Sequence, residues 1–356
     1  MILYYIFFLM SIISFVLPRK IGKLLSWMAF ALMFIMTFYR DSTVGTDTIN
    51  YLIYSDDHRQ SEYIVNFIST LMVSGILDDR GIICVTSLVT YFFSGLCVWK
   101  YKIEIKYFVL FFFLGNIFVM GMNISRQIAA VSIIAYFVPF INSCSTKKSL
   151  LFFVGIALAY GFHYSSVFCV LLYPILRYLD IKKQTLGIMM VLFSPLLLFN
   201  IIPVDSIMRS FIPKEYNSYS TVLSRNLEVS LLGYVYRLLL VFLQYKLLYT
   251  IKNPKLCILF VLGVLSSNIG IGMDSNVSRI FLIYSFLLVI IYSHIGGITK
   301  NGIREKWPLL LLIVLSTFFC FVGIQSNPDL NNYKFIDENT PHTYQDGFRR
   351  YRSYCL

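Results

Sequence analysis

The groups near the front of the chain that could do chemistry lie in one largely polar stretch, from Arg40 to Tyr51. Arg40 carries a guanidinium that can bind an anion, and Asp47 carries a carboxylate that can take up a proton. Gly45 precedes Asp47 closely and favours a turn at this point. The stretch therefore predicts a reaction or binding site. Asp41, however, is explained equally well as a loop residue or a helix cap.

Five further ionisable residues lie within or beside long apolar segments, where burial of a charge is costly and a function is the default expectation. They are Arg126, His163, Arg237, Asp274 and Arg279. Arg237 lies well inside an apolar segment, so it must face a polar cavity or pair with an acid. An interhelical salt bridge is the structural alternative for Arg237 and Arg279. His163 is either a hydrogen-bonded histidine at a helix end or a proton carrier or phosphate donor.

The composition indicates a membrane protein. Hydrophobic residues make up 58% of the 356 residues and charged residues only 13%, more apolar surface than a soluble protein could keep from water. Continuous apolar runs predict an all-α, polytopic integral membrane protein. The net charge is +12, and the basic residues lie in short loops between these runs, as membrane topology requires. The bilayer is therefore an expected partner, and nucleic acid is not. The odd number of Cys, seven, and the absence of metal-ligand or nucleotide-loop motifs predict no metal and no cofactor.

We predict about twelve membrane-spanning helices in a single transmembrane domain covering residues 1–325. Long outer loops are expected at 40–80 and 204–230, and a polar periplasmic tail at 326–356. The expected spans are 2–17, 23–39, 81–99, 107–122, 127–143, 150–162, 164–178, 185–203, 231–250, 256–273, 280–297 and 308–325.

The two kinds of basic residue separate by side. Lys-rich clusters at 19–23, 100–106, 147–148, 177–183, 246–255 and 300–306 fall in alternate loops, which the positive-inside rule assigns to the cytoplasm. The Arg40 loop and both termini then face outward, where Arg predominates and only Lys214 and Lys334 depart from the pattern. A guanidinium matches phosphate or carboxylate bidentately, so the outer face is predicted to recognise an anion. The alternative is that these Arg pair with the acids of the same face.

Short segments predict a polar cavity that opens outward. As a helix, segment 150–162 would be about 20 Å long against about 30 Å of hydrocarbon, so the turn 161–166 should lie below the outer surface. The turn 123–126 should likewise lie below the outer surface. Polar non-helical backbone at that depth is tolerated where it lines a cavity or is buried in protein. Residues 63–72 form an amphipathic pattern too short to span, and we expect a helix in the interface or over the cavity.

Four short motifs occur in order and together resemble the EpsG family of Wzy-type polysaccharide polymerases. The motifs are Arg40 through Gly45-Thr46-Asp47-Thr48 to Tyr51, Ser125-Arg126-Gln127-Ile128-Ala129, Ile156-Ala157 with Phe162-His163-Tyr164-Ser165, and Ser278-Arg279-Ile280 with Tyr284. The resemblance implies a GT-C-like helical fold in the bacterial inner membrane, with the active site facing the periplasm and a role in building O-antigen of lipopolysaccharide, capsule or exopolysaccharide. The paired Arg-x10-Gly loops of other Wzy branches are absent, since positions 137 and 236 are not Gly, so a two-loop catch-and-release mechanism is not expected.

The resemblance also implies a reaction. A growing glycan passes from undecaprenyl diphosphate to a sugar hydroxyl of an incoming lipid-linked repeat unit. Cations suffice to stabilise the departing diphosphate without metal, and Asp47 or His163 is the available base, with Arg40 positioning Asp47. Implied partners are the undecaprenyl-diphosphate-linked oligosaccharide and the chain-length regulator and flippase of the pathway. The expected substrate- and diphosphate-binding residues are Arg126, Arg237, Arg279, Gln127, Tyr51 and Tyr236.

Two alternatives come from other functional classes. A flippase or transporter of the same lipid-linked sugar would also need a cationic cavity, but two related halves would be expected, and the sequence shows no internal repeat. A metal-dependent lipid-phosphate-sugar glycosyltransferase would use Asp56 and Asp57, which superficially resemble an acidic metal site. An acceptor ligase or acyltransferase is a further possibility.

Overall fold

The computed structural model describes residues 2–40, 44, 62–78, 80–142, 146–199, 201, 231–269, 281–298 and 303–326, and 87% of these residues are helical. The expected all-α fold is therefore confirmed over this part of the chain. The helices are α1 (Ile2–Val16), α2 (Arg19–Phe38), α4 (Tyr63–Val73), α5 (Gly81–Lys100), α6 (Ile105–Leu114), α7 (Ile117–Asn123), α8 (Ser125–Phe137), η1 (Val138–Asn142), α9 (Thr146–Phe162), η2 (Tyr164–Leu171), α10 (Leu172–Tyr178), α11 (Lys183–Leu198), α14 (Leu231–Leu248), α15 (Pro254–Ile269), α17 (Leu282–Ile298) and α18 (Ile303–Ser326).

Each segment predicted to span the membrane coincides with a helix or with a consecutive pair of helices. By length and composition, α2 and α5 can each cross a membrane, and the α6–α7 pair passes the same test if it forms one bent span. The remaining apolar helices of the described part are shorter. The several apolar helices fit a membrane protein, while the number of about twelve spans stays a prediction. The predicted outer loop 204–230 and most of the tail 326–356 lie outside the described residues.

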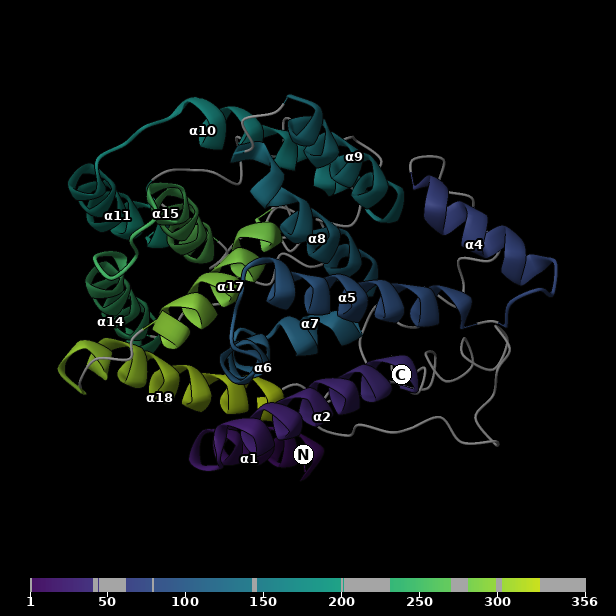
Figure 1. Ribbon diagram of the computed structural model, residues 1–356, viewed down its shortest axis with the longest axis horizontal. Helices are drawn as coiled ribbons and strands as arrows, with labels where there is room; N and C mark the ends of the chain where they lie inside the picture. The colour runs from purple at the N-terminus through teal and green to yellow at the C-terminus, as the bar shows by residue number, and fades with distance from the viewer. Residues whose placement is uncertain are drawn as a thin grey trace.

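The bundle has two groups of helices joined by α17. Helices α1, α2 and α5 to α9 form one group, and α11, α14, α15 and α18 form the other (Figure 1). Helix α17 packs against α6 and α8 on one side and against α15 on the other. Helix α8 is the centre of the first group, because every residue from Ser125 to Ala135 is buried. Its first turn carries Arg126 and Gln127, so both lie at one end of the best-protected helix of the group.

The segment 107–122 was predicted as one continuous span, and the structure breaks it. Helix α6 ends at Leu114, α7 begins at Ile117, and the two axes are bent by 55°. Asn116 adopts a left-handed conformation with φ 59°. Gly115 packs so closely on α17 that a Cβ there would lie 2.6 Å from a methyl group of Val289. The sequence Gly-Asn supplies the two residue types that tolerate such a break.

The chain around His163 is also more regular than the sequence suggested. Helix α9 has 17 residues, longer than the expected 150–162, and the expected turn shrinks to His163 in extended backbone with φ −156°. The 3-10 helix η2 follows at once, and α10 continues it. The Ser166 hydroxyl donates to the His163 carbonyl oxygen at 2.8 Å, which closes the first turn of η2. A single residue, His163, therefore reverses the chain between α9 and η2. Its side chain and its carbonyl oxygen both hydrogen-bond to residues that follow it in the sequence.

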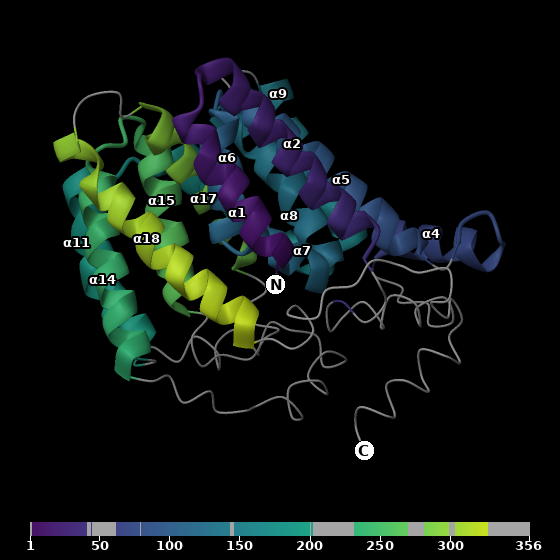
Figure 2. The same cartoon turned by 90° about the horizontal axis from the view of Figure 1, so that it is seen from below.

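The described members of the Lys-rich clusters lie at one end of the bundle. At this end, Arg19 and Lys106 both contact Glu104, Lys183 donates to the Ile251 carbonyl at 2.6 Å, and Lys255 donates to the Leu179 carbonyl at 2.9 Å. At the other end lie the last turn of α2, α4, the end of α7 and the start of α14 (Figure 2). The predominance of Arg at that second end, and the assignment of the two ends to cytoplasm and periplasm, stay predictions.

Helix α4 is the short amphipathic helix expected from residues 63–72, and it lies at the edge of the bundle against α5 and α9 (Figure 1). Ile68 and Met72 face inward as the pattern suggested. Phe67, however, is 63% exposed, because α4 is rotated so that its two ends pack on glycines. Ile64 and Tyr63 lie against Gly161 of α9, and Met72 lies against Gly81 of α5.

Gly161 offers a test of this packing. A Cβ at position 161 would lie 2.6 Å from Ile64 and 2.8 Å from the Tyr63 ring, so Gly161→Ala must push α4 outward. We expect a loss of about 1–3 kcal/mol in stability, measured as a lower midpoint of thermal unfolding of the purified protein in detergent. Gly95→Ala is the matched control, since nothing lies within 4 Å of its Cβ position on α5. Equal midpoints for the two variants would contradict the close approach of α4 to α9.

Candidate functional site

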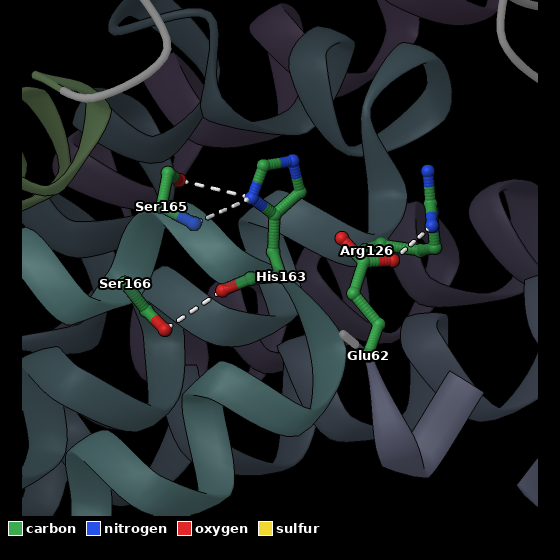
Figure 3. Close-up of polar contacts among 5 residues, drawn as sticks. All are labelled: Glu62, Arg126, His163, Ser165 and Ser166. Carbon is green, nitrogen blue, oxygen red and sulfur yellow. Dashed lines mark hydrogen bonds and ion pairs between the residues drawn. The ribbon is translucent and has the colours of Figure 1, made fainter. Parts of the chain in front are cut away.

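A buried ion pair joins α4 to α8. Arg126 is 8% exposed and Glu62 is 1% exposed, and the Arg126 guanidinium donates to the Glu62 carboxylate (Figure 3). Glu62 holds the N-cap position of α4 but makes no capping hydrogen bond to that helix. Its carboxylate reaches instead to a residue 64 positions away in the sequence. The contact is therefore a tertiary one, and it fixes the N-terminal end of α4 over the first turn of α8.

The first turn of α8 has features of an anion site. Ser125, Arg126 and Gln127 are all buried, and no side chain caps the helix N-terminus. The N-terminus of a helix carries a partial positive charge and N–H groups that favour anions. In the described part of the chain the Ser125 hydroxyl is buried without a hydrogen-bond partner. The Arg126 guanidinium, the N-terminus of α8 and the Ser125 hydroxyl could together bind a phosphate group.

His163 lies between α9 and η2 and is 7% exposed. The backbone N–H of Ser165 donates to its Nδ1 at 3.2 Å, and the Ser165 hydroxyl lies 2.9 Å from the same nitrogen (Figure 3). A nitrogen that accepts from a backbone N–H carries no proton, so the neutral ring has its proton on Nε2. The Tyr164 ring stacks on the imidazole with centroids 4.9 Å apart. The structural interpretation is confirmed, because His163 caps η2. Its role as a proton carrier or phosphate donor stays a prediction.

Helix contacts bring these groups to one place. Helix α8 packs against both α9 and η2, and α4 packs against α9. The Tyr63 hydroxyl, next to Glu62, donates to the Ala157 carbonyl of α9 at 2.5 Å. Figure 3 shows the Glu62–Arg126 pair and the His163–Ser165 pair in the same region. Two of the four sequence motifs, around Arg126 and His163, thus meet at the end of the first helix group that carries α4.

Arg40 is fully buried at the end of α2, and its neighbours give it a structural role. Its Nη1 donates to the Thr37 carbonyl at 2.9 Å. Arg80, at the N-cap of α5, donates to the carbonyls of Phe38 at 2.5 Å and Arg40 at 3.1 Å. Two guanidinium groups therefore satisfy the last carbonyls of α2, where cations are favoured by the helix dipole. That Arg40 also positions Asp47 stays a prediction.

Arg237 lies in the other helix group, away from Arg126. In the described part of the chain it pairs with no acid, so the salt-bridge alternative does not hold there. Its Nη1 donates to the Ser267 carbonyl of α15 at 3.3 Å, and the guanidinium lies 6.0 Å from the Tyr236 ring. Tyr236 in turn stacks on Phe319 of α18, with centroids 3.5 Å apart. Arg237 therefore keeps its net positive charge inside the bundle.

Several predicted site residues lie outside the described residues, and their placement stays a prediction. They are Asp41, Asp47, Tyr51, Asp56, Asp57, Asp274 and Arg279. Within the described residues, no group of three His, Cys, Asp or Glu side chains could hold a metal ion.

Glu62 is a site residue that the sequence analysis missed. It stands at the end of a loop with several acids, so its type and position do not distinguish it. A signal was nevertheless present: it is the acid that directly precedes the amphipathic run 63–72, and α4 is too short to span. An acid at the start of a helix that covers a cationic cavity is a natural partner for one of the cations.

One comparison with known proteins, that with family models, finds a match. The model of the EpsG family matches residues 23–336, which includes the Arg40, Arg126, His163 and Arg279 motifs. Neither the curated proteins nor the solved structures contain a match. The family places the chain among glycosyltransferase-type membrane proteins of polysaccharide biosynthesis. With its described part all helical and most of its length matched, the chain belongs to the EpsG family.

Proposed function

We propose that the protein is a polysaccharide polymerase. It transfers a growing glycan from undecaprenyl diphosphate to a sugar hydroxyl of an incoming lipid-linked repeat unit, on the periplasmic face of the inner membrane. The observation that carries the proposal is Arg126, a buried guanidinium at the uncapped N-terminus of the central helix α8. Such a position suits a diphosphate, and diphosphate is the leaving group of this reaction.

Stabilisation of the departing diphosphate is the main task of the site. As the bond from the anomeric carbon to the diphosphate oxygen breaks, negative charge grows on that oxygen. Arg126 can form two parallel hydrogen bonds to phosphate oxygens, and the first turn of α8 adds its positive end. The Ser125 hydroxyl and the Gln127 amide lie on the same turn and can contribute donors. These groups supply charge stabilisation from the chain's own residues.

His163 fits the role of a donor better than that of a base. Because Nδ1 accepts from Ser165, Nε2 is the nitrogen that carries a proton in the neutral ring. Nε2–H can donate to a phosphate oxygen or to the oxygen that leaves. Proton removal from the acceptor hydroxyl then falls to a carboxylate, for which Asp47 is the sequence candidate, with Arg40 as its positioning residue.

Arg237, Arg279, Tyr51 and Tyr236 complete the proposed substrate path. Arg237 retains an unneutralised charge in the described structure, which supports a second contact with phosphate. Tyr51 and Tyr236 can present aromatic faces to sugar rings. The pathway's flippase would supply the lipid-linked unit, and its chain-length regulator would act on the growing product.

The first test is polymerisation by the purified protein in proteoliposomes, with undecaprenyl-diphosphate-linked repeat units as substrate. Arg126→Ala removes one fixed cation from the leaving group, and we expect the rate to fall about 10²–10³-fold. Arg19→Ala is the matched control, because Arg19 lies at the opposite end on Glu104 and should leave the rate unchanged. Long-chain polymer at the normal level from Arg126→Ala would refute the proposed role of Arg126.

The second test separates the polymerase from its alternatives in cells. Deletion of the protein should leave surface lipid capped with a single repeat unit, because translocation continues without polymerisation. Loss of all surface repeats would instead identify a flippase. Loss of the purified protein's activity in EDTA would favour the metal-dependent transferase that uses Asp56 and Asp57.

The third test separates the two roles of His163, the capping of η2 through Nδ1 and the proposed donation through Nε2–H. The Asn amide oxygen can replace Nδ1 as the acceptor for Ser165, so His163→Asn should keep the thermal midpoint but lose transfer activity. The Gln amide can reach toward the Nε2 position, so His163→Gln should lose about 1 kcal/mol of stability but retain more activity than Asn. The reverse order of activities would show that His163 serves only to cap η2.

A further inference from the structure

We infer that Glu62, in place of the sequence candidate Asp47, is the general base of the transfer and so a catalytic residue, and that Arg126 holds it inactive until the substrate diphosphate takes its place. The inference rests on the proposed function and adds a residue that neither the motifs nor the family match assigns. It starts from the geometry: Glu62 is a buried carboxylate bonded directly to the guanidinium proposed to bind diphosphate. One cation cannot fully engage both anions at once.

The ion pair is the kind of contact that a diphosphate can displace. A diphosphate carries more negative charge than a carboxylate and forms the same bidentate contact with a guanidinium. It would also gain the first turn of α8 and the Ser125 hydroxyl, which is buried without a hydrogen-bond partner in the described part of the chain. Glu62 therefore occupies the anion position at Arg126 as an internal substitute for the diphosphate.

Displacement changes what Glu62 can do. A buried carboxylate that loses its guanidinium partner binds a proton more strongly, so it becomes a better base. The acceptor hydroxyl proton then passes to Glu62, and the acceptor oxygen forms its bond to the anomeric carbon. The bond from that carbon to the diphosphate oxygen breaks, and its electron pair leaves on the diphosphate. The sequence of events makes proton removal depend on a bound donor.

The structure of α4 permits the movement that this requires. Helix α4 has 11 residues and lies at the edge of the bundle, held near Glu62 by the ion pair and by the Tyr63 hydroxyl on Ala157. Beyond its other end, Gly75 has φ +75°, and no heavy atom lies within 4 Å of its Cβ position. A small rotation about that end, with Met72 kept against Gly81 of α5, would move Glu62 off Arg126.

The kinetic test compares Glu62→Gln, Glu62→Asp and wild type in the proteoliposome assay. Gln keeps a hydrogen-bond acceptor for Arg126 but cannot accept the proton, so kcat should fall about 10²–10⁴-fold while KM for the donor stays equal or falls. Asp should retain intermediate kcat. Glu104→Gln is the matched control, an acid paired with Arg19 and Lys106 at the opposite end. An unchanged kcat for Glu62→Gln, or a raised KM with unchanged kcat, would overturn the inference.

A binding measurement tests the displacement even if the chain is not a polymerase. Inorganic pyrophosphate is titrated into the detergent-purified full chain by calorimetry. Without a competing carboxylate, Glu62→Gln should bind pyrophosphate at least several-fold more tightly than wild type, and Arg126→Ala should not bind it. Weaker binding by Glu62→Gln would show that Glu62 only positions Arg126, and would overturn the inference. Failure of wild type to polymerise, together with tighter binding by Glu62→Gln, would reject the proposed function but keep the anion exchange.

Discussion

The arrangement of the end of this bundle that carries α4 depends on the cost of burying a guanidinium. Arg126 lies in the first turn of α8, the helix whose residues are buried over most of its length. A lone charge there would be strongly unfavourable, and breaking a buried pair typically costs about 3–5 kcal/mol. Glu62 neutralises it and ties the N-terminal end of α4 to α8, beside the close approach of Gly161 to Tyr63.

The pair is not needed for stability alone. Replacing a buried ion pair by apolar residues of similar volume is often neutral or stabilising, so such a pair is weak evidence of a stabilising role. The guanidinium groups of Arg80 and Arg237 donate to backbone carbonyls and form no ion pair within the described part of the chain. Arg126, in contrast, is bonded to the Glu62 carboxylate. An acid placed on the cation proposed to bind diphosphate is what a site that exchanges anions requires.

The sequence could predict the fold class because long apolar runs in a bilayer leave the backbone little choice but helix. It also predicted that the Lys-rich clusters share one side, and the structure places Lys106, Lys183 and Lys255 at one end of the bundle, with Arg19 beside them. The break at Gly115–Asn116 was less predictable, because it depends on the close approach of Val289 from a distant helix. Some residues of the candidate site could likewise be predicted from the sequence, and others could not. Arg126 and His163 stood out as polar groups beside apolar segments, whereas Glu62 gains its importance only from a partner 64 residues away.

The chemistry of a membrane polymerase gives a reason to withhold the base. A glycosyl diphosphate can be attacked by water as well as by a sugar hydroxyl, and a base exposed at all times would activate either. In the structure the Glu62 carboxylate is buried and bonded to Arg126. In the mechanism that we propose, Glu62 is released only when another anion compensates Arg126, and that anion is the donor's own diphosphate. The electrostatic requirement that a buried cation must have a partner thus becomes the means by which donor binding precedes proton transfer.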